Sequence, residues 1–320
     1  MSAAPRYQAG LHRYAVAVAG STLLLLFVGG LVTSTGSGLS VPDWPLSFGQ
    51  LMPALRGGVL FEHGHRMVAT AVGLLTIGLA VWLQRAEPRL WLRRLGLAAV
   101  GLVVLQGALG GLTVLLRLPT AVSVAHAGTA ELFFCLTTAI AVFTSRDWIE
   151  APEQGLDRSP RGAATLALAT AVVVYGQILL GALVRHSGAG LAIPDFPLAY
   201  GRLVPPFASP LVAIHFAHRV GALIATGCIA LTVFRVLRMP AAGPALRRPA
   251  LLLIVLVAWQ IFLGALTVWS RKAVIPTTLH LASGALILAT TVVLALRTQR
   301  LARPAQRSVA RPELTQPAAA

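Results

Sequence analysis

Two stretches of the chain decide its fold: GGLVTSTGSGLSVPDWPLSFGQLMP at 29–53 and GALVRHSGAGLAIPDFPLAYGRLVP at 181–205. They align without a gap at an offset of 152, and 13 of the 25 positions are identical. A second pair, LVVLQGALGGLTVLLR at 102–117 and LVAWQIFLGALTVWSR at 256–271, aligns at an offset of 154. Self-similarity at a nearly fixed offset indicates an internal repeat. The chain is therefore predicted to consist of two similar halves.

The sequence around these motifs is strongly apolar, with 56% hydrophobic and 11% charged residues. Windows of roughly 20 apolar residues can cross a hydrocarbon core of about 30 Å. Eight such windows recur, at 13–33, 63–83, 95–116, 120–144, 163–184, 211–234, 249–269 and 275–296. We expect an all-α integral membrane protein in which eight transmembrane helices form two pseudo-twofold-related four-helix bundles. An even number of crossings per repeat gives both halves one orientation.

The net charge of +16 is interpreted as a determinant of membrane orientation, so no nucleic-acid partner is expected. Lys and Arg crowd the N-terminus, the loops after the second, fourth and sixth helices, and the C-terminal tail. The positive-inside rule then puts both termini in the cytoplasm of a multi-pass cell-membrane protein surrounded by lipid. The expected halves are 1–150 and 151–320, the second with a basic cytoplasmic tail, and the polar stretch 145–162 is the predicted linker.

Four of the eight histidines occupy equivalent positions in the halves: His65 with His218, and His126 with His280. Each lies near the start of a helix that runs inward, so all four rings are expected in the outer half of the membrane. An ionisable side chain there needs a partner. Two imidazoles from facing helices of one bundle suit the axial positions of a heme iron. A lone histidine is more often hydrogen-bonded inside a bundle, but the two-by-two pattern favours heme.

Other metal chemistry fits the pattern less well. Zinc and copper usually take three or four protein ligands, and no third ligand type is repeated near the histidine pairs. Cys135 and Cys228 fall in apolar windows, where we predict neither a disulfide nor a thiol metal site. His12, His63 and His186 have no counterpart and are expected to be exposed.

Charged residues beside the histidines differ between the halves. Arg66 and Arg219 follow their histidines directly and could meet heme propionates, although a helix-end Arg that reaches water is an equal alternative. Glu62 precedes His65 by three residues on the same helix face, whereas the second half has His215 at that position. A carboxylate there could handle a proton or orient water; the alternative is a solvated acid at a helix N-terminus. The PDWP and PDFP loops could cover the two pockets or simply shape the turns.

Taken together, these motifs resemble the heme A synthase family over roughly 13–296. The resemblance rests on the outer-loop motif GGLVTSTGSGLSVPDWP and on the patterns ExxHR, HxxHR and two single histidines, formed by Glu62, His65, Arg66, His215, His218, Arg219, His126 and His280. It implies oxidation of a methyl group of heme O to the formyl group of heme A, which terminal oxidases use.

The resemblance also implies a division of roles. His65 and His126 would bind the substrate heme O, His218 and His280 would ligate a heme b cofactor through its iron, and Glu62 would be the catalytic acid or base. Expected partners are heme O, a heme O synthase and an electron acceptor. Many bacterial members carry a cysteine pair in the first outer loop, and residues 34–61 contain none, which leaves the electron route open.

Two other functions fit parts of the same pattern. A non-catalytic diheme b-type cytochrome would use the same four histidines, with Glu62 incidental. A parallel-repeat transporter would need polar residues along both halves of the helices. The apolar windows are almost unbroken below the histidines, with Glu131, Gln106, Gln177 and Gln260 as the main exceptions.

Overall fold

The computed structural model describes residues 5–150, 159–240 and 242–302, and within these ranges the chain folds into helices joined by turns and loops. The first half of the chain contains α1 (Ala9–Ser34), α2 (Gly58–Ala86), α3 (Leu90–Leu115), α4 (Thr120–Phe143) and the short α5 (Arg146–Ile149). The second contains α6 (Ser159–His186), the 3-10 turn η1 (Ala189–Leu191), α7 (Pro210–Leu237), α8 (Pro244–Trp269) and α9 (Val274–Ala302).

Eight of these helices are long and apolar enough to cross a membrane, which confirms the eight predicted windows. The observed helices extend past the windows by a few residues, for example to Ala9–Ser34 for the window 13–33. In the predicted linker 145–162, α5 occupies Arg146–Ile149, and residues 151–158 lie outside the described part. The basic tail after residue 302 also lies outside it.

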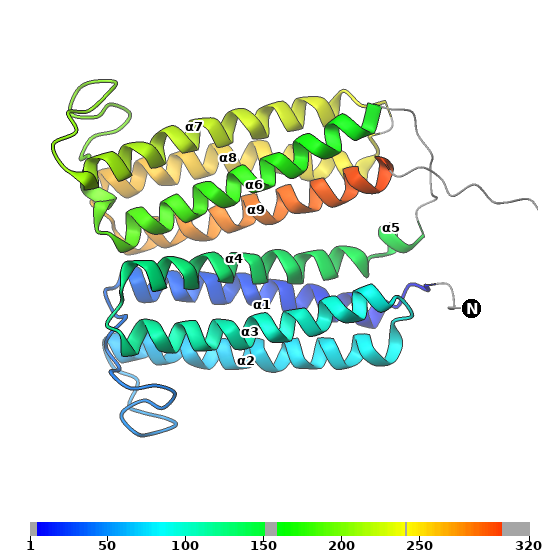
Figure 1. The fold of residues 1–320 in the computed structure, drawn as a ribbon, viewed down its shortest axis with the longest axis horizontal. Helices are drawn as coiled ribbons and strands as arrows, with labels where there is room; N and C mark the ends of the chain where they lie inside the picture. The colour runs from blue at the N-terminus through cyan, green and yellow to red at the C-terminus, as the bar shows by residue number, and fades with distance from the viewer. Residues whose placement is uncertain (1–4, 151–158, 241, 303–320) are drawn as a thin grey trace, which may run out of the picture.

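The long helices pack as two groups of four (Figure 1). In the first group α1 contacts α2, α2 contacts α3, α3 contacts α4, and α4 returns to α1. In the second group α6, α7, α8 and α9 form the same closed ring of contacts. The groups meet where α1 and α4 pack against α6 and α9. Each half is therefore a four-helix bundle, and α1, α4, α6 and α9 form the junction between them.

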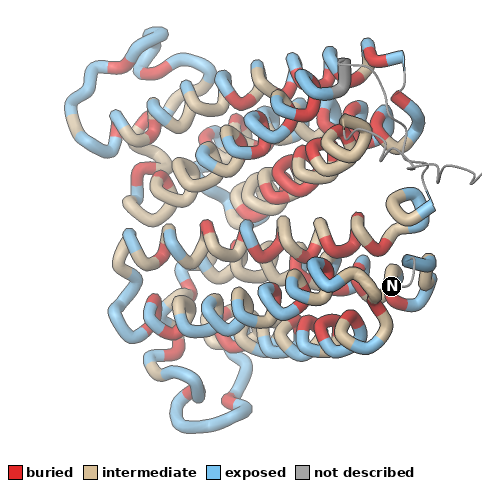
Figure 2. Tube along the Cα trace, turned by 45° about the vertical axis from the view of Figure 1, so that its right-hand side comes forward, coloured by how far each residue is buried: buried red, intermediate tan, exposed pale blue. Residues whose placement is uncertain are grey.

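Each bundle has its own apolar core, and residues at the outer surface of the bundles are exposed (Figure 2). Leu79 and Ile140 are fully buried in the first core, and Leu253 and Leu294 in the second. Large aliphatic side chains point away from the bundles along most helices; exposed examples are Leu74, Val104, Val172, Leu223 and Val255. Exposed apolar surface of this extent suits a lipid environment.

Candidate heme-binding site

The four paired histidines lie at one end of the molecule. His65, His126, His218 and His280 each lie six to eight residues after the first residue of α2, α4, α7 or α9. These four helices all begin at the end that carries the two long loops (Figure 1). Within each bundle the two rings are near enough to interact electrostatically, His65 with His126 and His218 with His280. The structure thus brings together, within each bundle, the two histidines that the sequence predicts to lie on facing helices.

Each of these rings packs against a glycine of the preceding helix. A Cβ added to Gly29 of α1 would lie 3.1 Å from Cε1 of His65, and one added to Gly181 of α6 would lie 3.0 Å from Cε1 of His218. The same contact joins Gly110 to His126, at 3.3 Å, and Gly264 to His280, at 3.1 Å. Any side chain larger than hydrogen would press on the ring, so the four glycines fix where the imidazoles lie.

Three of the four rings carry a buried nitrogen without a hydrogen-bond partner in the described residues. These atoms are Nδ1 of His65, His126 and His280. His218 differs, because Nε2 of Gln177 lies 2.9 Å from its Nδ1 and 2.8 Å from its backbone oxygen. The other ring nitrogen of His280, Nε2, lies 3.4 Å from Nε2 of Gln260. Buried polar atoms are almost always paired, so the three unpaired imidazole nitrogens indicate a ligand.

This arrangement fits heme. Neutral imidazole nitrogen is an axial ligand of heme iron, and facing helices of a four-helix bundle can present one from each side. Among the described residues, no group of three or more His, Cys, Asp and Glu side chains could hold a bare metal ion. Cys135 and Cys228 are free thiols in different halves. A cofactor that brings its own equatorial ligands matches the donors present.

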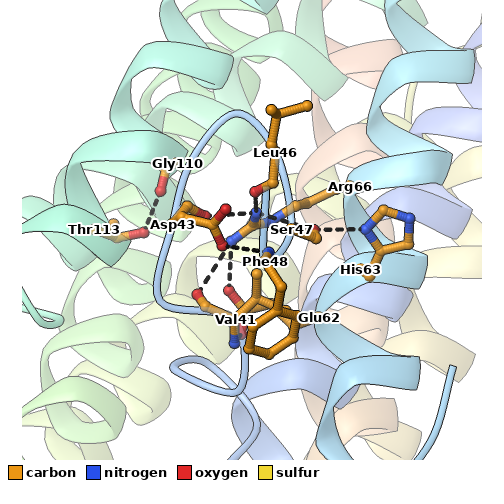
Figure 3. A network of polar contacts seen from close by, with 10 residues as sticks. All are labelled: Val41, Asp43, Leu46, Ser47, Phe48, Glu62, His63, Arg66, Gly110 and Thr113. Atoms are coloured by element: carbon orange, nitrogen blue, oxygen red, sulfur yellow. Dashed lines mark hydrogen bonds and ion pairs between the residues drawn. The ribbon is translucent and has the colours of Figure 1, made fainter. Parts of the chain in front are cut away.

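The first outer loop is tied to the start of α2 by a clamp around Glu62 and Arg66 (Figure 3). The Val41 backbone N–H donates to Oε2 of Glu62 at 2.8 Å, and Arg66 donates to Oε1 at 2.8 Å. The same guanidinium donates to the backbone oxygens of Asp43 and Leu46, both at 2.8 Å. Both oxygens of the buried Glu62 carboxylate are therefore engaged.

The second outer loop has the same clamp with different chemistry. Ile193 N–H donates to Nδ1 of His215 at 3.2 Å, and Nε of Arg219 lies 3.4 Å from Nε2 of that ring. Arg219 also donates to the backbone oxygens of Asp195, at 2.6 Å, and Leu198, at 2.8 Å. An imidazole in one half and a carboxylate in the other thus accept the same loop N–H.

An aspartate shapes the tip of each loop. Backbone N–H groups of Gly49 and Phe48 donate to Asp43 and lower the pKa of its exposed carboxyl below the ordinary value. Gly201 and Tyr200 lower the pKa of Asp195 in the same way. A carboxylate that accepts two backbone hydrogen bonds is stabilised in its charged form. The two loop tips therefore share one turn, in which the aspartate carboxylate accepts two backbone hydrogen bonds.

These contacts bear on three predicted site residues. Glu62 lies one helical turn from His65, as expected, but its oxygens bind the loop and Arg66. The guanidiniums of Arg66 and Arg219 bind loop carbonyls; their contact with heme propionates stays a prediction. The expectation that His63 is exposed is wrong, since it is 6% exposed and its Nδ1 lies 2.8 Å from the Ser47 hydroxyl. The ring fills the space under the folded loop.

The sequence interpretation overlooked two features of the site. The glycines that contact the histidine rings, Gly29 with Gly181 and Gly110 with Gly264, are aligned within the repeat. Their spacing alone does not show which ring each glycine touches. Arg185 near the end of α6 went unremarked, although it replaces Thr33 of the first half and is a basic residue beside an apolar window. A departure from the repeat that introduces a charge was the signal available.

Comparisons with known proteins find one matching family model and several relatives that share one printed name. A family model, COX15-CtaA, described as cytochrome oxidase assembly protein, matches residues 56–292. A heme A synthase of Symbiobacterium thermophilum is 36% identical over 259 residues, which cover 79% of this chain and 84% of the relative. A heme A synthase of Methylobacterium sp. strain 4-46 is 32% identical over 321 residues, covering 83% and 85%. One of Alkalihalophilus pseudofirmus is 33% identical over 216 residues, covering 66% and 71%.

Proposed function

The chain belongs to the COX15-CtaA family of cytochrome oxidase assembly proteins, and we propose that it is a heme A synthase, an oxidoreductase that converts a methyl group of heme O to the formyl group of heme A. It is a multi-pass protein of the cell membrane. The observation that supports the proposal most directly is that each bundle holds two histidines whose rings pack against glycines of the preceding helices. Two such pairs supply one site for a substrate heme and one for a resident heme.

We assign the substrate to the N-terminal half, residues 1–150, and a heme b cofactor to the C-terminal half, residues 151–320. His65 and His126 would bind heme O, and His218 and His280 would hold heme b. The contact of Gln177 with His218 supports this division, because Leu25 stands at the matching position beside His65. A ligand ring oriented by a hydrogen bond suits a permanent cofactor, whereas a substrate must also leave.

Glu62 is the residue of this chain that we assign to proton handling during methyl oxidation. It is 4% exposed, one turn before His65, and its carboxylate is oriented by Val41 and Arg66. Conversion of a methyl to a formyl group releases protons, and a fixed carboxylate beside the substrate can accept one. When bound, heme b would supply the redox chemistry that carries electrons away from the oxidised methyl group.

The two bundles are proposed to be related by a pseudo-twofold axis along the membrane normal, with both termini in the cytoplasm. The identical ring of helix contacts in each half and the distribution of Lys and Arg support this orientation. The heme sites then lie toward the outer side. A heme O synthase that delivers substrate and an electron acceptor that reoxidises heme b complete the proposed set of partners.

Extraction of the hemes from the purified protein tests the function. We expect heme b together with heme O or heme A, identified by chromatography and mass. Heme b alone, with no heme A formed in cells that supply heme O, would leave a b-type cytochrome as the function. Absence of any heme would favour a transporter.

A matched pair of variants tests the division between the halves. His280→Ala should remove an axial ligand of heme b and convert its low-spin spectrum to high-spin, whereas His126→Ala should leave that spectrum intact. The reverse pattern would exchange the roles of the two halves.

A further inference from the structure

Arg185 ties the two halves together near the outer end of α6. Its guanidinium donates to the Gly30 backbone oxygen at 3.1 Å and to the Ser34 hydroxyl at 2.5 Å, both on α1. The Ser34 hydroxyl also accepts a hydrogen bond from Thr278 of α9 at 3.0 Å. Arg185 is partly buried, and it points into the junction of α1, α6 and α9 instead of toward the surrounding lipid.

Within the described part of the chain, no carboxylate forms an ion pair with Arg185. The ion pairs among the described residues are Arg66 with Glu62, Arg89 with Glu87, and Arg146 with Glu150. The partners of Arg185 are a carbonyl and a hydroxyl, which bind the cation but do not neutralise it. A partly buried cation at membrane depth is costly unless an anion lies beside it. The site is therefore short of one negative charge.

Arg185 lies near the glycines that contact the histidine rings in both halves. Gly181, one turn earlier on α6, holds the ring of His218, and Gly30 directly follows Gly29, which holds His65. Arg185 is also near enough to interact electrostatically with His280. Because Arg185 follows Gly181 by four residues on α6, its guanidinium would be within reach of a carboxylate carried by a group held between His218 and His280.

We propose that Arg185 binds a propionate carboxylate of the heme held by His218 and His280. This inference rests on the proposed function, because it requires heme in the C-terminal half. Guanidinium matches a carboxylate with two parallel hydrogen bonds, and Arg185 uses only one of its terminal nitrogens on α1. The propionate supplies the missing charge, and the cation in turn raises the reduction potential of the heme.

The alternative is that Arg185 serves only as a tie between α1 and α6, and three variants separate the two roles. Arg185→Gln removes the charge, Arg185→Lys keeps it, and Ser34→Ala weakens the tie while leaving the guanidinium. In Arg185→Gln we expect a lower midpoint potential of heme b and roughly tenfold faster loss of heme to apomyoglobin. Arg185→Lys should keep most of the potential, and Ser34→Ala should match the wild type in both measurements.

A wild-type potential and heme loss rate in Arg185→Gln would overturn the proposal. An equal fall in Ser34→Ala and Arg185→Gln would also overturn it, because the tie alone would then explain both. A second measurement uses only the wild-type chain: after removal of heme, it is reconstituted with protoheme or with protoheme dimethyl ester, whose propionates are uncharged. The ester should reproduce the lower potential and faster release, and identical values for the two hemes would contradict the pairing.

The result for the wild-type protein separates this inference from the proposed function. If purified wild-type protein contains no heme ligated by two histidines, the heme assignment of the C-terminal half fails. If it contains that heme and the charge variants leave it unchanged, only the role of Arg185 fails.

Discussion

At the residue scale, the two clamps show how one position can change chemistry without changing its contact. Glu62 and His215 both accept the backbone N–H of the loop residue at the matching place, Val41 or Ile193. Both also contact the arginine one turn later. The loop therefore does not need a carboxylate, because an imidazole holds it in the second half. The contact with the loop therefore does not by itself explain a carboxylate in the first half.

Substitution of Glu62 by the residue found in the second half tests whether the carboxylate has a further role. Glu62→Gln keeps an oxygen acceptor for Val41, and Glu62→His copies the clamp of the second half, but neither keeps the negative charge. If the charge serves methyl oxidation, both variants should retain heme b and accumulate heme O or a hydroxylated intermediate in place of heme A. The measurement is the ratio of heme A to heme O at equal protein and heme b levels.

A wild-type ratio in Glu62→His would show that Glu62 serves only as a clamp for the loop. Loss of heme b along with heme A would instead indicate that the bundle is disturbed, and Glu62→Asp then serves as the charge-preserving control.

At the element scale, the long helices were predictable because lipid imposes both their length and their composition. The equivalence of His65 with His218, and of His126 with His280, also followed from the repeat. The loop clamps were not predictable, since they depend on how Val41 and Ile193 fold back onto helices that begin many residues later. The charge at Arg185 was visible in the sequence, but its contact, Gly30, lies 155 residues away in the other half.

The contact between Gly181 of α6 and His218 of α7 gives a prediction for this pair of helices. A methyl group at position 181 would lie 3.0 Å from Cε1 of His218, tighter than nine in ten such contacts, so the ring must give way by a few tenths of an ångström. Gly181→Ala should therefore weaken or abolish the low-spin heme b spectrum, although Ala favours a helix over Gly by about 1 kcal/mol. The measurement is the heme b content and spectrum of the purified variant.

Gly176→Ala is the matched control on the same helix, because nothing lies within 4 Å of a Cβ at that position. Its heme content should equal that of the wild type. Equal spectra in the two variants would show that contact with Gly181 does not position His218.

At the scale of the whole molecule, the junction of α1, α4, α6 and α9 sets how the two bundles, each with its histidine pair, lie relative to each other. Arg185 and Ser34 bridge this junction near its outer end, and the buried Glu131 of α4, where Ala285 stands in the second half, breaks the repeat deeper within it. The repeat predicts two equal bundles. Three of the residues that depart from it, Arg185, Glu131 and Glu62, lie where the bundles touch or beside the first loop.

The orientation in the membrane gives the final prediction. The start of α1, the α2–α3 turn, the end of α4 and the α7–α8 turn lie at the end of the molecule opposite the two long loops (Figure 1). Arg85, Arg89 and Arg93 flank the α2–α3 turn, so the positive-inside rule assigns that end to the cytoplasm. Reporter fusions at residues 150 and 310 should therefore read cytoplasmic, and a fusion at residue 50 external. An external signal at 150 together with a cytoplasmic one at 50 would invert the protein and put the histidine pairs on the inner side, where heme O would have to arrive, and its electrons leave, on the cytoplasmic side.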